Sequence, residues 1–408
     1  MTSVEPSYVD RSVTVRLSVL AAGLFVVGTN AFVIAGVLPD IARSLGTTQG
    51  DVSLSITLYA VIVAVGSPAV SILLARVDRS HLMAAGLLLI GVGTGVAALA
   101  GTVGAFDLGR ALAAVGGAAL VPTATAAAPT LVPPERRGRA IGTVALGFTF
   151  ATAVGSPAGT ALAGVGGWRL PLGVLAVAAV VVAVAVLLIV RDVPGGAAIG
   201  FGARLGVLRH PRIAAALVGS VFLTTAFNVV YLFSAAVTSE AVGSRAGVLA
   251  VLLLVYGAGG VVGNLLAGRL ADRLGTTRVL LVALALQAVV LAAMAVADRV
   301  TIGAAVTYFA VGIVAFASVV PLQHLLVQLA PEAAGISLSW YSTGMYVGIA
   351  LAPLIGSAAL SSGHDGGPVL VPLAGAVLTV AALLAVVVSI RLSTGRVRPP
   401  RRPAPRNP

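Results

Sequence analysis

The sequence has no cysteine and no lysine, and it carries little charge of either sign. Of its 408 residues 9% are charged and 59% are hydrophobic. An ordinary soluble domain has about 25% charged residues, and a surface built from so few charges would expose large apolar patches. The composition therefore excludes a soluble enzyme, a secreted scaffold and a disordered protein. It predicts an integral membrane protein.

The missing residue types also exclude several kinds of chemistry. Without cysteine there is no disulfide, no thiolate nucleophile and no Cys metal site. Without lysine there is no nucleotide-binding loop of the form G-x-x-x-x-G-K-[ST]. The four histidines show no metal-ligand spacing, and no pair of acids suits hydrolysis. We expect no cofactor, no metal and no enzymatic activity.

The positive net charge of +12 reflects membrane topology. In a soluble protein such a charge would suggest nucleic acid, but here every basic residue is Arg and the arginines lie between apolar blocks, so no nucleic-acid partner is expected. With the N-terminus inside, twenty of the 25 arginines fall on inner segments, four on outer ends and one, Arg110, within a span. This asymmetry places both termini in the cytoplasm. The Ala, Gly, Val and Arg excess suggests a bacterial inner (cytoplasmic) membrane protein.

Long apolar runs are abundant, and each is close to the roughly 20 residues that a bilayer-spanning helix needs. None alternates with period two, and lipid permits only helices or closed barrels, so the spans are predicted to be helices. The fold class is all-α. Twelve spans are predicted, at 17–38, 53–74, 82–102, 106–128, 141–163, 169–190, 212–237, 245–267, 278–297, 301–325, 334–359 and 368–391.

The spans divide into two halves. The break lies at a cytoplasmic central loop, 191–211, which contains Pro194-Gly195-Gly196. We therefore expect an N-terminal six-helix half at 1–190 and a C-terminal one at 212–391. Residues 392–408, with five Arg and five Pro, are predicted to be a basic cytoplasmic tail that determines topology. Binding of that tail to anionic lipid is the alternative.

Arg110 and Asp107 are the candidate charged site. An intramembrane Arg costs at least about 2.5–3.5 kcal/mol, so it normally faces a wet cavity or a partner. The alternative is an Arg near the outer end that reaches the interface. Asp107 lies three residues before it on the same helix face. Asp107 either caps the outer end of its helix or carries the coupled proton.

Polar residues also gather inside three other spans. Span seven carries Ser220, Thr224, Asn228 and Tyr231 within an arc of about 80°. Span one has Thr29 and Asn30, and span eleven has polar and aromatic positions. Each such residue could simply bond a neighbouring helix, but the span-seven set is predicted to line a cavity. The predicted substrate-binding residues are Asn30, Arg110, Thr224, Asn228, Tyr231, Trp340 and Tyr346.

Several local motifs resemble the major facilitator superfamily. Gly268 to Arg278, with Asp272 and Arg273, matches the superfamily's inner-loop signature almost fully. The equivalent stretch after span two is degraded, since Ala75 stands where an Asp is expected. Gly155-Ser156-Pro157-Ala158-Gly159 resembles the signature of its antiporters, and Arg110 followed by Gly116 resembles the Arg-centred signature of span four. Pro134 to Ala140 and Gly167-Trp168-Arg169 are similar to loops of the same branch.

The resemblance covers nearly the whole chain and points to the twelve-span drug:proton antiporter branch, which includes chloramphenicol and arabinose exporters. It implies alternating access by two rocking halves, with gating through Gly155, Pro157, Gly159, Gly268, Asp272, Arg273 and Arg278. The expected partners of this monomer are a small drug-like or amphipathic substrate, protons and the lipid bilayer.

One departure keeps other functions open. Many relatives have an intramembrane Glu immediately before Phe32, where this chain has Ala31. Asp107 beside Arg110 is therefore the remaining candidate for proton coupling. The alternatives are a sugar or metabolite exporter or facilitator without tight proton coupling, and a non-transporting membrane sensor. A sensor would be favoured by a large soluble signalling domain, which the sequence does not contain.

Overall fold

The fold is a bundle of long helices, seen in a computed structural model. It describes residues 6–74, 76–133, 136–191, 193, 201–243, 245–297, 300–362 and 367–394. Within that part of the chain all regular structure is helical. The α-helices are α1 (Pro6–Leu45), α2 (Gln49–Leu73), α3 (Arg79–Leu99), α4 (Val103–Ala127), α5 (Arg137–Phe150), α6 (Ser156–Gly166), α7 (Arg169–Ile189), α8 (Phe201–Leu208), α9 (Pro211–Leu232), α10 (Ser234–Val237), α11 (Ser239–Val242), α12 (Ala246–Leu274), α13 (Thr276–Ala297), α14 (Thr301–Leu329), α15 (Ala334–Ser362) and α16 (Gly367–Thr394).

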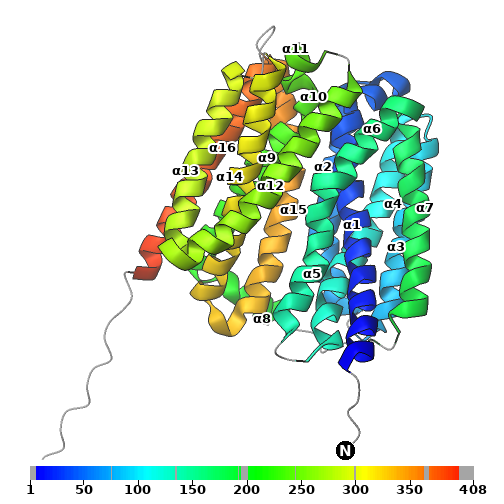
Figure 1. The fold of residues 1–408 in the computed structure, drawn as a ribbon, viewed down its shortest axis with the longest axis vertical. Coiled ribbons are helices and arrows are strands. Elements are labelled where there is room, and N and C mark those ends of the chain that lie inside the picture. Colours follow the sequence, from blue (N-terminus) through cyan, green and yellow to red (C-terminus); the bar gives the residue numbers. More distant parts are fainter. Residues whose placement is uncertain are drawn as a thin grey trace, which may run out of the picture.

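Twelve helical segments in the described residues are long and apolar enough to cross a bilayer, which confirms the predicted number of spans and the all-α fold class. An even number of crossings brings the start of α1 and the end of α16 to the same end of the bundle. We call this end the terminal end and the other the opposite end. Figure 1 shows helices α1–α7 forming one half and α9–α16 the other.

The structure interrupts two predicted spans: span seven (212–237), where α9 ends at Leu232 and α10 begins at Ser234, and span five. Between α5 and α6 the backbone widens into a π-helical turn, η3 (Ala151–Gly155). Pro157, in the first turn of α6, has no N–H to donate, and π turns of this kind occur frequently at functional sites. The sequence predicted one helical span here, with Pro157 and its neighbouring glycines permitting a bend, but it did not predict a π turn.

Three hydrophobic cores hold the bundle together, and they are not equivalent. One core lies at the opposite end and contains residues of both halves. Among them are Ala31–Ala42 of α1 and Tyr346–Ala352 of α15. The second is confined to the first half, with Leu17–Val27 of α1 among its members. The third is confined to the second half and includes Leu322 and Val386. The halves therefore share a core at the opposite end and have separate cores at the terminal end.

Direct contacts between the halves agree with this division. Helix α2 packs against α15, and α12 packs against η3 and α6. The Thr57 hydroxyl donates to the Ala350 carbonyl at 2.8 Å, and the hydroxyls of Ser53 and Ser357 lie 3.2 Å apart. These bonds join the N-terminal part of α2 to the C-terminal part of α15. The protein is thus closed at the opposite end.

Candidate transport site

Arg110 is the most deeply buried charge in the described part of the chain, with an exposed fraction of 1%. Its Nη1 donates to the Asn30 backbone carbonyl at 2.8 Å and to the Asn30 side-chain oxygen. The guanidinium also lies 4.5 Å from the centre of the Tyr59 ring, a cation–π contact. Its Nε and Nη2 have no hydrogen-bond partner. A buried charge with two unused donors is costly, and these donors are available to an acceptor in another state.

A second contact fixes the direction of the Asn30 side chain. Its Nδ2 donates to the Thr94 hydroxyl of α3, and Asn30, Thr94 and Arg110 are all buried. The amide can therefore present its oxygen to Arg110 only in one orientation. Asn30 and Arg110, both predicted, are brought together across α1 and α4. Thr94 and Tyr59 were not predicted. Each had a signal in the sequence: Thr94 is an isolated hydroxyl residue in an apolar span, and Tyr59 is one of few aromatic residues.

Removing the Thr94 hydroxyl should weaken transport. In a Thr94→Val variant the Asn30 amide loses its acceptor, which costs about 1–3 kcal/mol for a buried group, and the amide no longer holds the Arg110 guanidinium. We expect a fall in transport rate of roughly 5- to 140-fold at normal expression, on the scale of 1.4 kcal/mol per tenfold. Thr94→Ser keeps the hydroxyl and should retain most of the activity. Equal activity of the Val and Ser variants would contradict this role.

Asp107 lies on α4 one turn before Arg110 and is half-buried. One of its carboxylate oxygens is buried without a hydrogen-bond partner. It is not the helix cap, because Thr102 is the N-cap residue of α4 and accepts from the Ala105 amide at 3.3 Å. The capping alternative for Asp107 is therefore wrong. The carboxylate and the guanidinium are electrostatic partners without a direct bond in this state.

The predicted stripe on span seven, now α9, divides into two parts. Ser220 and Thr224 are buried against α15, where Gly344 and Gly348 leave them room. A Cβ added at Gly348 would overlap the Thr224 side chain. These two positions thus contribute to helix packing in this state. Periodicity identifies a shared face but does not say what lies against it.

The other part of the stripe meets the first half of the chain. Asn228 and Tyr231 line a small cavity together with Phe32 of α1, Ile56 of α2 and Ile349 of α15. It has room for about one water molecule. Tyr346 is buried in the shared core, and Trp340 lies half-buried beside the core of the second half. In this state, Asn228 and Tyr231 therefore lie together, apart from Trp340.

The segment that carries the predicted gating residues of span five, η3 and α6, lies between α1 of the first half and α12 of the second. Gly155 packs so closely on Thr29 of α1 that a Cβ would overlap the hydroxyl, and Gly159 meets Val33 in the same way. On its other side, η3 meets α12 of the second half, where Gly257 leaves no room for a Cβ beside Ala153. The π turn is thus wedged between α1 and α12, so that a change in its winding would move both.

The inner-loop motifs lie at the terminal end. Gly268 and Arg273 are on the last turns of α12, which is followed by the C-cap residue Gly275 with a φ of 87°, and Arg278 is exposed in the first turn of α13. The side chain of Asp272 lies outside the described residues. In the degraded copy after α2, Arg79 donates to the Ala126 carbonyl of α4 at 2.6 Å.

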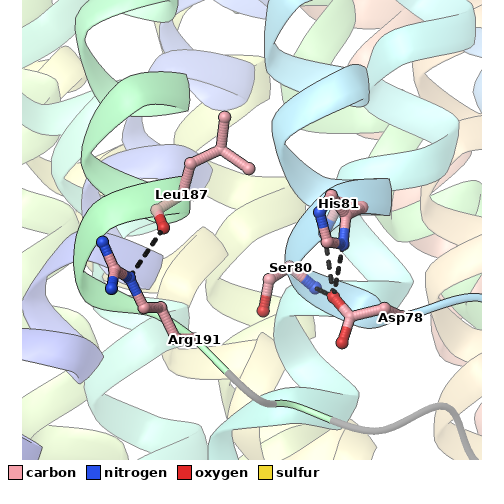
Figure 2. Close-up of polar contacts among 5 residues, drawn as sticks. All are labelled: Asp78, Ser80, His81, Leu187 and Arg191. Carbon is pink, nitrogen blue, oxygen red and sulfur yellow. Dashed lines mark hydrogen bonds and ion pairs between the residues drawn. The ribbon is translucent and has the colours of Figure 1, made fainter.

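The acid that the degraded copy lacks at position 75 is present three residues later. Asp78 caps α3 by accepting from the Ser80 and His81 amides at 2.9 and 3.1 Å, and it pairs with the His81 ring at 3.1 Å (Figure 2). Burial raises the pKa of Asp78, but these hydrogen bonds outweigh it and hold the pKa below the ordinary carboxylate value. Figure 2 also shows Arg191 donating to the Leu187 carbonyl at the end of α7. Asp78 and Arg191 both stabilise helix ends here.

Two halves that share a core at one end only, with a buried polar network inside the first half, form the architecture of a membrane transporter. The profile of the Major Facilitator Superfamily matches residues 20–353 and 217–408. The chain belongs to this superfamily. The fold agrees with solved structures of a bacterial homologue of the human lysosomal transporter Spinster in inward-facing conformations. They superpose with TM-scores of 0.69 and 0.70 at 17% and 16% identity, over 95% and 96% of this chain and 97% of that chain.

Relatives of similar length support the same conclusion. The chain is 32% identical to the inner membrane transport protein YdhP of Escherichia coli (strain K12) over 383 residues, 92% of this chain and 96% of that protein. It is 30% identical to a chloramphenicol resistance protein of Streptomyces lividans over 362 residues, 86% of this chain and 90% of that protein. The protein is a multi-pass membrane transporter.

Proposed function

We propose that the chain is a proton-coupled exporter of a small drug-like or amphipathic molecule that works by alternating access. It lies in the bacterial cytoplasmic membrane with both termini in the cytoplasm, as the distribution of arginines favours. The terminal end is then the cytoplasmic end. One observation carries the proposal: the halves share a core at the opposite end only. A rocking motion that exchanged the closed and open ends would move a bound molecule across the membrane.

Proton coupling is assigned to Asp107 and Arg110. When Asp107 loses its proton, its carboxylate can accept hydrogen bonds from the unused Nε and Nη2 donors of Arg110. Protonation removes that attraction and leaves the arrangement described above, in which the two groups are not bonded. The proton would thus move the guanidinium between Asn30 and Asp107. This displacement is the link between the proton and the substrate site.

Export of a drug-like molecule is favoured by the relative that is named a chloramphenicol resistance protein. The proposed substrate contacts are Asn30, Arg110, Thr224, Asn228, Tyr231, Trp340 and Tyr346, several of which surround the junction of the two halves. A second candidate is a sugar or metabolite exporter without tight coupling. It is favoured by Ala31, because the family resemblance predicts an acidic residue at this position and Ala31 is apolar.

The Asp107→Asn variant separates the two candidates. The amide cannot titrate, so we expect uptake of chloramphenicol into inverted membrane vesicles against its gradient to be lost, while downhill exchange remains. The readout is accumulation with and without an imposed pH gradient. Asp51→Asn is the matched control, because Asp51 is an exposed carboxylate in the capping box of α2, at the same end of the bundle. Accumulation by Asp107→Asn at the wild-type level would contradict the assignment of coupling to Asp107.

A further inference from the structure

Aromatic residues are scarce, at 5% of the sequence, yet six of them form one continuous series of ring contacts. We call these six rings the aromatic arc. Consecutive ring centres are 5.7, 5.7, 5.1, 6.1 and 6.3 Å apart. These distances lie in the range of attractive aromatic pairs. In order, the rings are Phe148 of α5, Phe32 of α1, Tyr231 of α9, Tyr256 of α12, Phe316 of α14 and Phe227 of α9.

The aromatic arc crosses from one half to the other where the shared core ends. Phe32, Tyr231 and Tyr256 belong to the shared core and are 8%, 3% and 3% exposed. Phe148 and Phe316 pack on its edge, and Phe227 packs on the edge of the separate core of the second half. These three outer rings are half-buried. They therefore retain free ring surface at the level where the halves separate, beside the small cavity that Phe32 and Tyr231 line.

The charges around the aromatic arc restrict what it can bind. Asp and Glu occur within the spans only near their ends, at Asp40, Asp51, Asp107 and Glu332. The central parts of the twelve spans thus provide no carboxylate, and Asp107, the nearest one in α4, is already the electrostatic partner of Arg110. Arg110 adds a buried positive charge near Asn30, two residues before Phe32. A cation entering here would lose hydration without gaining a counter-charge, and the guanidinium would repel it.

We infer that the aromatic arc is the substrate site and that it binds uncharged molecules containing an aromatic ring, whereas organic compounds with a fixed positive charge are not substrates. This inference rests on the proposed export function and narrows its substrate class. The arc spans both halves, so a ring bound there contacts helices that move relative to each other. Binding of a ring in the aromatic arc therefore affects the packing of both halves.

Uptake by inverted vesicles containing the full chain tests the substrate class. The uncharged aromatic probes are chloramphenicol and 4-nitrobenzyl alcohol, the cationic probes are ethidium and tetraphenylphosphonium, and arabinose is the non-aromatic probe. We expect proton-driven uptake of at least one uncharged aromatic probe and none of either cation. Uptake of a cation, or uptake of arabinose alone, would overturn the inference while leaving export intact. Uptake of no probe by vesicles that contain folded protein would overturn this inference and also count against the proposed export function.

Variants on one helix test the location. Phe316→Ala should raise the KM for the transported aromatic probe roughly 2- to 12-fold, the scale of one lost ring contact. Phe309→Ala is the matched control, because Phe309 lies two turns earlier on α14 and is 38% exposed outside the arc. Phe148→Leu, which keeps apolar volume but removes the ring, should raise KM in the same way without loss of folded protein. Equal KM values for wild type, Phe316→Ala and Phe148→Leu would place the substrate elsewhere.

Discussion

Cysteines introduced at Ser53 and Ser357 should form a disulfide that stops transport. The two hydroxyl oxygens lie 3.2 Å apart across α2 and α15, so sulfur atoms in their places would need to move by only about 1 Å to reach the S–S bond length of about 2.05 Å. Alternating access requires the opposite end to open, and this contact must then separate. A covalent bond there would hold the closed end closed. The chain has no natural cysteine, so the bond can form only between the introduced pair.

Transport in vesicles before and after oxidation measures the effect, with the fraction of cross-linked protein followed by its gel mobility. Oxidised double-cysteine protein should fall to the background of vesicles without the transporter, and reductant should restore the rate. Ser53→Cys and Ser357→Cys alone are the controls and should transport at the wild-type rate under oxidation. Full activity in quantitatively cross-linked protein would show that this end does not need to open.

The sequence was sufficient for the architecture because the bilayer imposes one dominant constraint. Backbone groups in lipid must be satisfied within the segment, so an apolar run of span length is a helix. That argument yields twelve spans and two halves without any knowledge of neighbours. It does not reveal the π turn at Ala151–Gly155, because the apolar pattern remains helical through it, and Pro157 indicates a bend in this span but not the widened turn before it.

The site was only partly predictable, because its contacts join residues far apart in the chain. A buried Arg in a span demands a partner, and this identified Arg110. The partner itself, Asn30, lies 80 positions away, and Thr94 lies 64 positions from Asn30. No helical periodicity relates such positions. The same limit explains why Ser220 and Thr224 were predicted to line a cavity. Their common helix face was evident from the sequence, but the helix packed against it, α15, was not.

Replacing Arg110 by methionine should abolish transport while leaving the protein folded. Methionine fills a similar volume and removes a buried charge whose Nε and Nη2 donors are unpaired. Removal of the charge and its two unpaired donors is favourable, whereas the two Asn30 oxygens lose their donor, at about 1–3 kcal/mol for a buried group, so we expect a small net change in stability. The variant loses the contacts with Asn30 and Tyr59 and any contact with Asp107. Because the guanidinium contacts the Tyr59 ring and keeps two further donors for another acceptor, Arg110→Lys should restore little activity.

Arg169→Met is the matched control for this variant. Arg169 also lies over an aromatic ring, with its guanidinium 4.2 Å from the centre of the Trp168 ring. Its other bonds go to Ser44 and the Ala100 carbonyl, at the ends of helices in the first half. We therefore expect Arg169→Met to lower the unfolding temperature in detergent and to keep transport, whereas Arg110→Met abolishes transport and changes the unfolding temperature less. We would measure vesicle transport and thermal unfolding on both variants. The two measurements distinguish a charge that moves during transport from one that stabilises helix ends. Wild-type transport by Arg110→Met would show that the guanidinium has no part in the cycle.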